Sequence, residues 1–208
     1  MKLKICGMKY QENITEVAAL QPDYLGFIFY DKSSRNFDTS IPEISSSIKK
    51  TGVFVNEDLQ VVIEKIKTFN LQAVQLHGEE SPEYCASLKG KVSEIIKVFS
   101  IKNEFNFEVL KPYESVCDYF LFDTKGKHPG GNGYTFDWNV LSNYPSTKPF
   151  FLSGGIGFDE IEAVKKFQQS TASKYCYALD VNSKFEIEPG LKNIELLKKF
   201  KQSLSFRS

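Results

Sequence analysis

The sequence predicts an α/β protein: a single (β/α)8 barrel, or TIM barrel, with a parallel eight-stranded core over residues 1–208. Eight short segments rich in β-branched and aromatic residues recur along the chain, and most precede a segment with apolar residues every three or four positions. No linker or change in composition divides the chain. This alternation favours a parallel sheet covered by helices, and eight repeats favour its closure, with a doubly wound open sheet as the alternative.

The expected strands are runs in which nearly every residue is apolar, such as YLGFIFY and YFLFDT. Runs of this kind are typical of parallel strands that are buried on both faces. In chain order they cover residues 3–8, 24–30, 51–57, 73–78, 93–100, 119–124, 149–155 and 176–182.

Five of the expected helices show a clear apolar stripe. They cover residues 12–21, 58–69, 81–89, 158–168 and 193–204. We expect weaker helices after the second and the fifth strand, and the segment IPEISSSIKK at 41–50 has only a loose stripe.

The composition argues against several functions. Lys and Arg together number 26, as do Asp and Glu, so no net charge attracts nucleic acid or an anionic membrane. Hydrophobic residues make up 41% of the chain, yet no apolar run approaches the roughly 20 residues of a membrane span. Met1 leads directly into the first expected strand, without the apolar region of a signal peptide. We therefore expect a cytoplasmic protein that binds neither nucleic acid nor membrane.

Cysteine usage points away from disulfides and metal. The four cysteines form no C-x-x-C pair, and a chain of this length does not depend on disulfides. The two histidines, His77 and His128, lack the spacing of a zinc site. Cys6 is therefore either a buried core residue or a residue that takes part in the chemistry, and we expect the remaining cysteines to be structural. These are Cys85, Cys117 and Cys176.

Four expected strands end in side chains that can carry chemistry. Because side chains alternate along a strand, Lys4 and Cys6 share the inward face of the first strand. The same alternation directs His77, Asp123 and Asp180 inward on the fourth, sixth and eighth strands. Active sites of (β/α)8 barrels lie at these carboxyl ends, so the four end groups are expected around one mouth. Each also has a structural interpretation: a small core residue, a hydrogen-bonded histidine or a helix cap.

Two loops have the composition of a phosphate site. FLSGGIG follows the seventh strand and ALDVNSKFE follows the eighth, where such barrels often bind phosphate through backbone amides. Gly154 and Gly155 allow close approach of the backbone, and Asn182 and Ser183 can cap or donate. The alternative is that the glycines only turn the chain. The loop GKHPGGNGYTFDW at 126–138 has the character of a flap that closes over substrate.

Seven motifs, in order along almost the whole chain, resemble the phosphoribosylanthranilate isomerase family of tryptophan biosynthesis. They are KICGM, YLGFIFYDKSSR, GVFVNE, VQLHGEES, FDTKGKHPGGNGYTFDW, LSGGIG and ALDVNSKFE. The resemblance implies a (β/α)8 enzyme without cofactor or metal. Its small-molecule substrate would be N-(5-phosphoribosyl)anthranilate, converted by an Amadori rearrangement to 1-(2-carboxyphenylamino)-1-deoxyribulose 5-phosphate. A monomer or a homodimer is expected.

The resemblance also assigns roles. Cys6 is implied as the general base and Asp123 as the general acid, while Arg35 matches the arginine that binds the anthranilate carboxylate. His77 and Asp180 are expected to support substrate binding. The ordinary pKa values are about 3.9 for Asp and about 8.5 for Cys, so the site is expected to raise the first and lower the second.

One residue departs from the family pattern. Lys184 stands in the phosphate loop where family members commonly have glycine, so we expect ordinary backbone angles there, with the ammonium near the phosphate. Two other functions remain open. One is another phosphate-binding barrel, such as the histidine-pathway aminoaldose isomerase with its two catalytic aspartates, against which Cys6 argues. The other is a non-catalytic phosphosugar-binding barrel, which is expected to lack Cys6 or Asp123.

Overall fold

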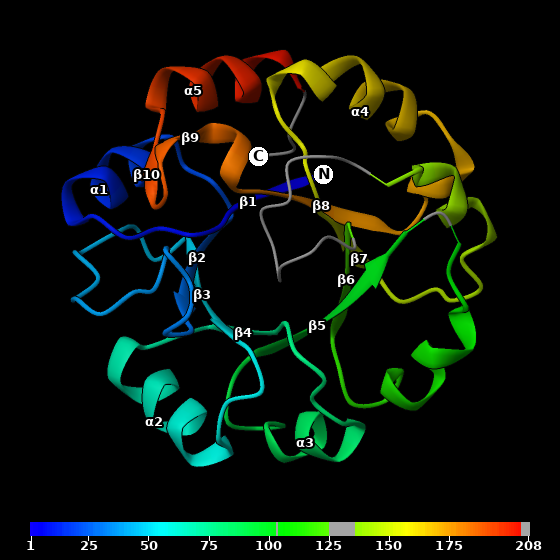
Figure 1. Cartoon of the computed structure of the whole chain (residues 1–208), viewed down its shortest axis with the longest axis horizontal. Helices are drawn as coiled ribbons and strands as arrows, with labels where there is room; N and C mark the ends of the chain where they lie inside the picture. The colour runs from blue at the N-terminus through cyan, green and yellow to red at the C-terminus, as the bar shows by residue number, and fades with distance from the viewer. Residues whose placement is uncertain (103, 125–135, 205–208) are drawn as a thin grey trace.

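Eight parallel strands close into a barrel in sequence order, with β1 paired to both β2 and β8 (Figure 1). The computed structural model describes residues 1–102, 104–124 and 136–204. The strands are β1 Lys2–Ile5, β2 Tyr24–Phe29, β3 Lys49–Phe54, β4 Ala73–Leu76, β5 Glu94–Ile101, β6 Tyr119–Thr124, β7 Phe150–Leu152 and β8 Cys176–Val181. The prediction of a (β/α)8 barrel is confirmed, and the open sheet is excluded by the β1–β8 pairing.

The five clearly striped helices form close to their expected positions and lie outside the strands (Figure 1). They are α1 Gln11–Ala19, α2 Leu59–Phe69, α3 Pro82–Ser87, α4 Ile161–Gln168 and α5 Ile194–Ser203. Side chains at Asp58, Ser81 and Asn193 accept hydrogen bonds from the backbone of the first turns of α2, α3 and α5. These caps fix where the three helices begin. No helix in the described residues is long and apolar enough to cross a membrane.

Of the two weaker helices, the one expected after β2 was predicted wrongly, and the one expected after β5 forms only as a 3-10 helix. The segment after β2 has no helix, and its last residues, Lys49 and Lys50, already belong to β3. Ser45 and Ser47 hydrogen-bond to each other and to local backbone, a pattern that competes with a helix. Phe37 covers the barrel there by packing on Phe27.

After β5 the chain forms only a 3-10 helix, η1 Phe107–Tyr113, because Pro112 lacks the amide hydrogen that a longer α-helix needs. Four further 3-10 helices are present in the described part of the chain: η2 Trp138–Asn143, η3 Phe158–Glu160, η4 Thr171–Ser173 and η5 Ser183–Phe185. After η5, a short antiparallel hairpin joins β9 Glu186–Glu188 to β10 Leu191–Lys192. The sequence pattern did not predict this hairpin.

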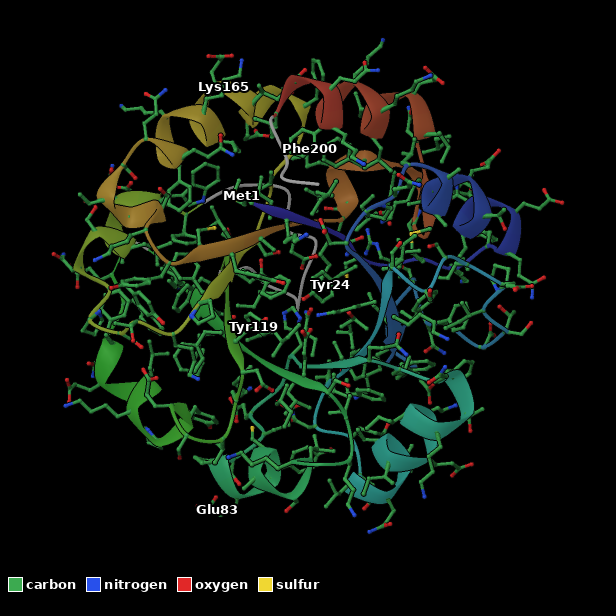
Figure 2. All side chains as sticks on the ribbon, turned by 180° about the vertical axis from the view of Figure 1, so that it is seen from behind. Met1, Tyr24, Glu83, Tyr119, Lys165 and Phe200 are labelled. Atoms are coloured by element: carbon green, nitrogen blue, oxygen red, sulfur yellow. The ribbon has the colours of Figure 1, made fainter. Side chains whose placement is uncertain are left out.

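Alternation along the strands divides the core into two layers. Leu121 of β6 belongs to a small cluster inside the barrel, whereas Phe120 and Phe122 pack outward under the helices. Figure 2 shows Tyr24 and Tyr119 within the ring of strands, while Glu83 and Lys165 lie on helices at the periphery. Because the interior is filled, ligands can reach only the ends of the barrel.

Candidate active site

A cavity at the carboxyl ends of the strands is lined by all nine residues that the sequence selected. These residues come from six separate strand ends and the loops that follow them. They are Cys6, Arg35, His77, Asp123, Gly154, Gly155, Asp180, Asn182 and Ser183. The fold thus brings together side chains that are up to 177 positions apart in the sequence, counting from 6 to 183.

Cys6 lies one residue beyond β1, and its amide donates to the carbonyl of Val181 at 2.9 Å, so the pairing with β8 continues through it. The residue is buried, at 4% exposure. Gly26 of β2 provides the space beside it, because a Cβ atom there would lie 2.7 Å from Sγ. This role of Gly26 could not be predicted from the sequence, since one glycine in an apolar strand has several explanations.

Lys4 and Asp180 form a buried ion pair below Cys6. Lys4 Nζ donates to Asp180 Oδ1 at 2.8 Å, across the register pairing of β1 with β8. Burial alone would lower the pKa of Lys4, but Asp180 and the Cys6 sulfur outweigh it, so the ammonium form is stabilised. Burial raises the pKa of Asp180 and Lys4 opposes this rise.

The electrostatics of Cys6 differ from the expectation. Burial raises the pKa of its thiol, and the nearby ammonium groups of Lys4 and Lys192 only partly offset this effect. Asp180 adds to the rise. Positive charge therefore favours the thiolate, as expected, but desolvation has the larger effect on the pKa of Cys6.

Asp123 is buried and fixed through one carboxylate oxygen, since Oδ1 accepts the amide of Thr124 at 2.8 Å. Its other oxygen lies 3.3 Å from His77 Nε2, close enough for an ion pair with a protonated ring, although the alignment is not that of a hydrogen bond. Gln75 Nε2, as the amide is assigned, lies 3.2 Å from His77 Nδ1. An amide NH2 group only donates, so a neutral ring would carry its proton on Nε2, facing Asp123.

A second buried ion pair holds the segment that carries His77. Lys97 Nζ donates to the carbonyls of Leu76 and Gly78, the two neighbours of His77, at 3.3 and 2.7 Å. It also donates to Glu80 Oε2 at 3.0 Å, and Glu80 accepts the Gly78 amide. The side chains of Lys97 and Glu80 are 3% and 1% exposed. Sequence reasoning did not single out this pair.

The loops after β7 and β8 face the same side of the cavity. Gly154 has a φ of +90°, and a Cβ atom there would lie 2.5 Å from the Thr124 amide nitrogen, so the position requires glycine. Asn182 and Ser183 open the short helix η5, where backbone amides lack intrahelical partners. Both loops line the cavity, and the first amides of η5 have no intrahelical partner.

The sequence matches, over residues 3–203, the family model described as N-(5'phosphoribosyl)anthranilate (PRA) isomerase. The chain belongs to this isomerase family. A relative from Parabacteroides distasonis is 43% identical over 98% of this chain and 93% of its own. One from Phocaeicola vulgatus is 39% identical over 93% of this chain and 92% of its own. Both carry the name N-(5'-phosphoribosyl)anthranilate isomerase, so the predicted family, an isomerase of tryptophan biosynthesis, is confirmed.

Solved structures of phosphoribosyl anthranilate isomerases have the same fold. The Thermotoga maritima protein superimposes with a TM-score of 0.83 at 30% identity, and alignment covers 98% of each chain. The Thermus thermophilus protein gives a TM-score of 0.83 at 26% identity, with 98% of each chain covered. Another isomerase, at 27% identity and a TM-score of 0.76 over 96% of each chain, was solved with reduced 1-(o-carboxyphenylamino)-1-deoxyribulose 5-phosphate.

The residue by which this chain departs from the isomerase pattern has ordinary geometry. Lys184 lies within η5, and its φ is not among the positive values found at non-glycine residues. The expected backbone conformation is confirmed. Lys184 is exposed at the edge of the cavity, and its Cβ packs beside Gly157, where an added Cβ atom would lie 2.8 Å away.

The predicted flap at 126–138 falls largely outside the described residues, which resume at Phe136. The Phe136 amide donates to Thr124 Oγ1 at 3.1 Å, which joins the end of this loop to β6 beside Asp123. His128 also lies outside the described part of the chain.

Proposed function

We propose that the protein converts N-(5'-phosphoribosyl)anthranilate to 1-(2-carboxyphenylamino)-1-deoxyribulose 5-phosphate, with Cys6 as general base and Asp123 as general acid. The observation that supports these roles is that both side chains, at the ends of β1 and β6, line one cavity. Arg35 and the loops that follow β7 and β8 line the same cavity. The reaction needs one acid, one base and two anion sites, and the cavity has candidates for each.

The acid acts first. Protonated Asp123 donates to the ribose ring oxygen while the bond from that oxygen to carbon 1 breaks, and the nitrogen lone pair forms an iminium with carbon 1. The carboxylate that remains lies beside His77 Nε2, at 3.3 Å. Although the two groups are not aligned for a hydrogen bond, the N–H dipole of the ring is proposed to stabilise the carboxylate and so favour proton transfer to the substrate.

The base acts second. The Cys6 thiolate removes the proton on carbon 2, the released electron pair forms the bond between carbons 1 and 2, and the iminium electrons return to nitrogen. The resulting enol-amine then tautomerises to the ketone: carbon 1 gains a proton, and the hydroxyl on carbon 2 releases one as its oxygen becomes the carbonyl oxygen. Lys4 and Lys192 favour the thiolate, while burial opposes it.

The two ends of the substrate carry the anions. The amides near Gly154, Gly155, Asn182 and Ser183 are the proposed phosphate site, and Arg35 is the proposed partner of the anthranilate carboxylate. Asp180 is placed by Lys4 and by Ser153 Oγ, which donates to it at 3.3 Å, and is proposed to orient a substrate hydroxyl or the amine.

An assay with freshly generated phosphoribosylanthranilate tests the reaction directly, through the loss of anthranilate-type fluorescence. Acceleration well above the spontaneous rate is the expected result. A rate equal to the spontaneous rate would contradict the catalytic proposal and leave a phosphosugar-binding barrel. Activity only on the aminoaldose of the histidine pathway would favour that isomerase instead.

We further propose that residues 1–208 act as one catalytic barrel, in the cytoplasm, as a monomer or a homodimer. The free thiols of Cys6, Cys85, Cys117 and Cys176 suit a reducing compartment. The Thermotoga maritima isomerase is dimeric, and monomers of it have been generated. Light scattering on the purified chain, at several concentrations, distinguishes the two assembly states.

A further inference from the structure

Arg35 is held side-on by a carboxylate from the hairpin that follows β8. Its Nε donates to Glu186 Oε1 and Oε2 at 2.8 and 3.0 Å, and its Nη2 donates to Oε2 at 2.6 Å. The side chains are 17% and 5% exposed. Planar bidentate pairs of this kind fix the orientation of a guanidinium as well as its position.

Glu186 is itself fixed from two other directions. It accepts Lys192 Nζ at 2.7 Å and the Gly190 amide at 3.0 Å. Burial would raise the pKa of Glu186, but Arg35 and Lys192 outweigh it and hold the pKa below its ordinary value, so the group stays ionised. Lys192 Nζ also donates to Asn182 Oδ1 at 2.7 Å, which links this network to the proposed phosphate loop.

The arginine stem has little room to move. A Cβ atom at Gly7 would lie 2.9 Å from Arg35 Cδ and 2.5 Å from Asn182 Oδ1, and Gly7 has a φ of +74°. The glycine after Cys6 therefore lets the Arg35 stem cross the end of β1. The guanidinium is constrained by Gly7 along its stem and by Glu186 at one edge.

These contacts leave one edge of the guanidinium for a ligand. Glu186 occupies Nε and one side of Nη2, and within the described residues Nη1 makes no hydrogen bond. A guanidinium has a second two-nitrogen edge, made by Nη1 and the other N–H of Nη2. Glu186 faces two basic side chains, Arg35 and Lys192, and burial lowers the pKa of Lys192.

We propose that Glu186 is a positioning residue that turns the Nη1–Nη2 edge of Arg35 toward the substrate carboxylate and so sets the specificity for it. This inference rests on the proposed role of Arg35. The alternative role for Glu186 is that of a competitor, which occupies Arg35 in place of the substrate carboxylate. A competitor would weaken binding, and its removal would improve KM, whereas the loss of a positioning residue worsens KM.

The test compares two inhibitors: the reduced product analogue 1-(o-carboxyphenylamino)-1-deoxyribulose 5-phosphate, and the same compound without its carboxylate. The ratio of their inhibition constants measures carboxylate recognition, because a general structural defect would weaken both alike. We expect Glu186→Gln to reduce the ratio about tenfold, since a guanidinium that is no longer held by a charged carboxylate keeps only part of its bidentate contact with the ligand. KM should rise more than kcat falls.

Three further variants make the result decisive. Glu188→Gln alters a carboxylate on the same strand, bonded to the exposed Tyr10 hydroxyl, and should leave the ratio unchanged. Glu186→Asp keeps the charge but shortens the side chain, and the ratio of inhibition constants should again fall. If circular dichroism shows that Glu186→Gln is unfolded, Glu186→Asp takes its place in the test. Arg35→Lys should abolish most of the ratio.

The outcomes separate the two proposals. If Arg35→Lys keeps the full ratio, Arg35 does not bind the carboxylate, and the proposed role of Arg35 fails. If Arg35→Lys loses the ratio while folded Glu186 variants keep it, or if their KM falls, Glu186 is not a positioning residue. A loss in both, with Glu188→Gln unchanged, supports the inference.

Discussion

Lys4 Nζ lies 2.8 Å from Asp180 Oδ1, and the lysine side chain is completely buried. The two residues are register partners in β1 and β8, and Cys6 follows two positions after Lys4 on the same inward face. The pair thus brings a permanent cation close to the thiol without exposing it to solvent. Its effect should be visible in the pH dependence of catalysis.

Replacing Lys4 by Met should move the ascending limb of the kcat/KM profile to higher pH. The ammonium of Lys4 opposes the rise in the Cys6 pKa, so its removal raises that pKa further and reduces the thiolate fraction at neutral pH. The loss of rate should be larger at neutral than at alkaline pH. Lys2→Met, on the same strand but paired with Asp23 at 2.8 Å and 35% exposed, is the matched control. An unshifted limb in folded Lys4→Met would contradict this account.

Replacing Cys6 by Ser should lower kcat by at least about 10²-fold, because a hydroxyl is too weak an acid to supply the base and a positioned base contributes about 10²–10⁴. The serine fits the space beside Gly26, so the fold should persist. Cys176→Ala, at the opposite end of the barrel wall, should retain activity. Turnover near that of the unaltered protein would assign Cys6 to structure.

Replacing Asp123 by Asn should also lower kcat by at least about 10²-fold, because the amide cannot transfer a proton to the ring oxygen. Asn has the same shape and can still accept the Thr124 amide, so packing is preserved. Single-turnover fluorescence measurements separate the chemical step from product release. If the chemical step keeps its rate in the pure variant, another group is the acid.

Replacing Lys184 by Ala should raise KM by no more than about tenfold, mainly at low salt, and leave kcat nearly unchanged. The side chain is exposed at the edge of the cavity, so its attraction for phosphate is screened. Steady-state kinetics at two ionic strengths measure this. A large fall in kcat would place Lys184 at the reacting centre.

Replacing Lys97 by Met should destabilise the protein by about 3–5 kcal/mol, because it leaves the buried carboxylate of Glu80 without its cation. Adding Glu80→Gln should restore part of that loss, since the uncompensated charge is then removed. Lys111→Met, from an exposed pair with Glu108, should cost less than about 1 kcal/mol. Urea unfolding gives all three values. Equal effects of Lys97→Met and Lys111→Met would contradict the argument.

Features of the fold that depend on a local pattern of residues could be predicted from the sequence. Alternation along YFLFD places Leu121 and Asp123 on one face, and the structure has Leu121 inside the barrel and Asp123 on the cavity. The apolar stripes likewise located the five clear helices, whereas their caps, such as Asp58, were identified only in the structure. The helix expected over 41–50 failed because hydrogen bonding among Ser45 and its neighbours competes with helix formation.

The partners of the site residues could not be predicted, because they depend on distances between loops. Arg35 and Glu186 are 151 positions apart, and nothing in their local sequences indicates that they meet. Lys97 looks like a charged interruption in an apolar strand until the loop that carries Glu80 is placed above it. The ionisation of Cys6 depends on the balance between burial and these distant cations, so it too required the structure.

The pairing of β1 with β8 also has a consequence for how the protein folds. Lys4 and Asp180 are 176 positions apart, and their ion pair lies where the first and last strands close the ring, so we expect it to form late. Contacts between such distant parts of a chain are entropically slow to form. Partly assembled barrels would leave Lys4 hydrated and the Cys6 thiol open to alkylating reagents. The rate at which Cys6 becomes protected during refolding should therefore report the time of ring closure, separately from the earlier gain of helical signal.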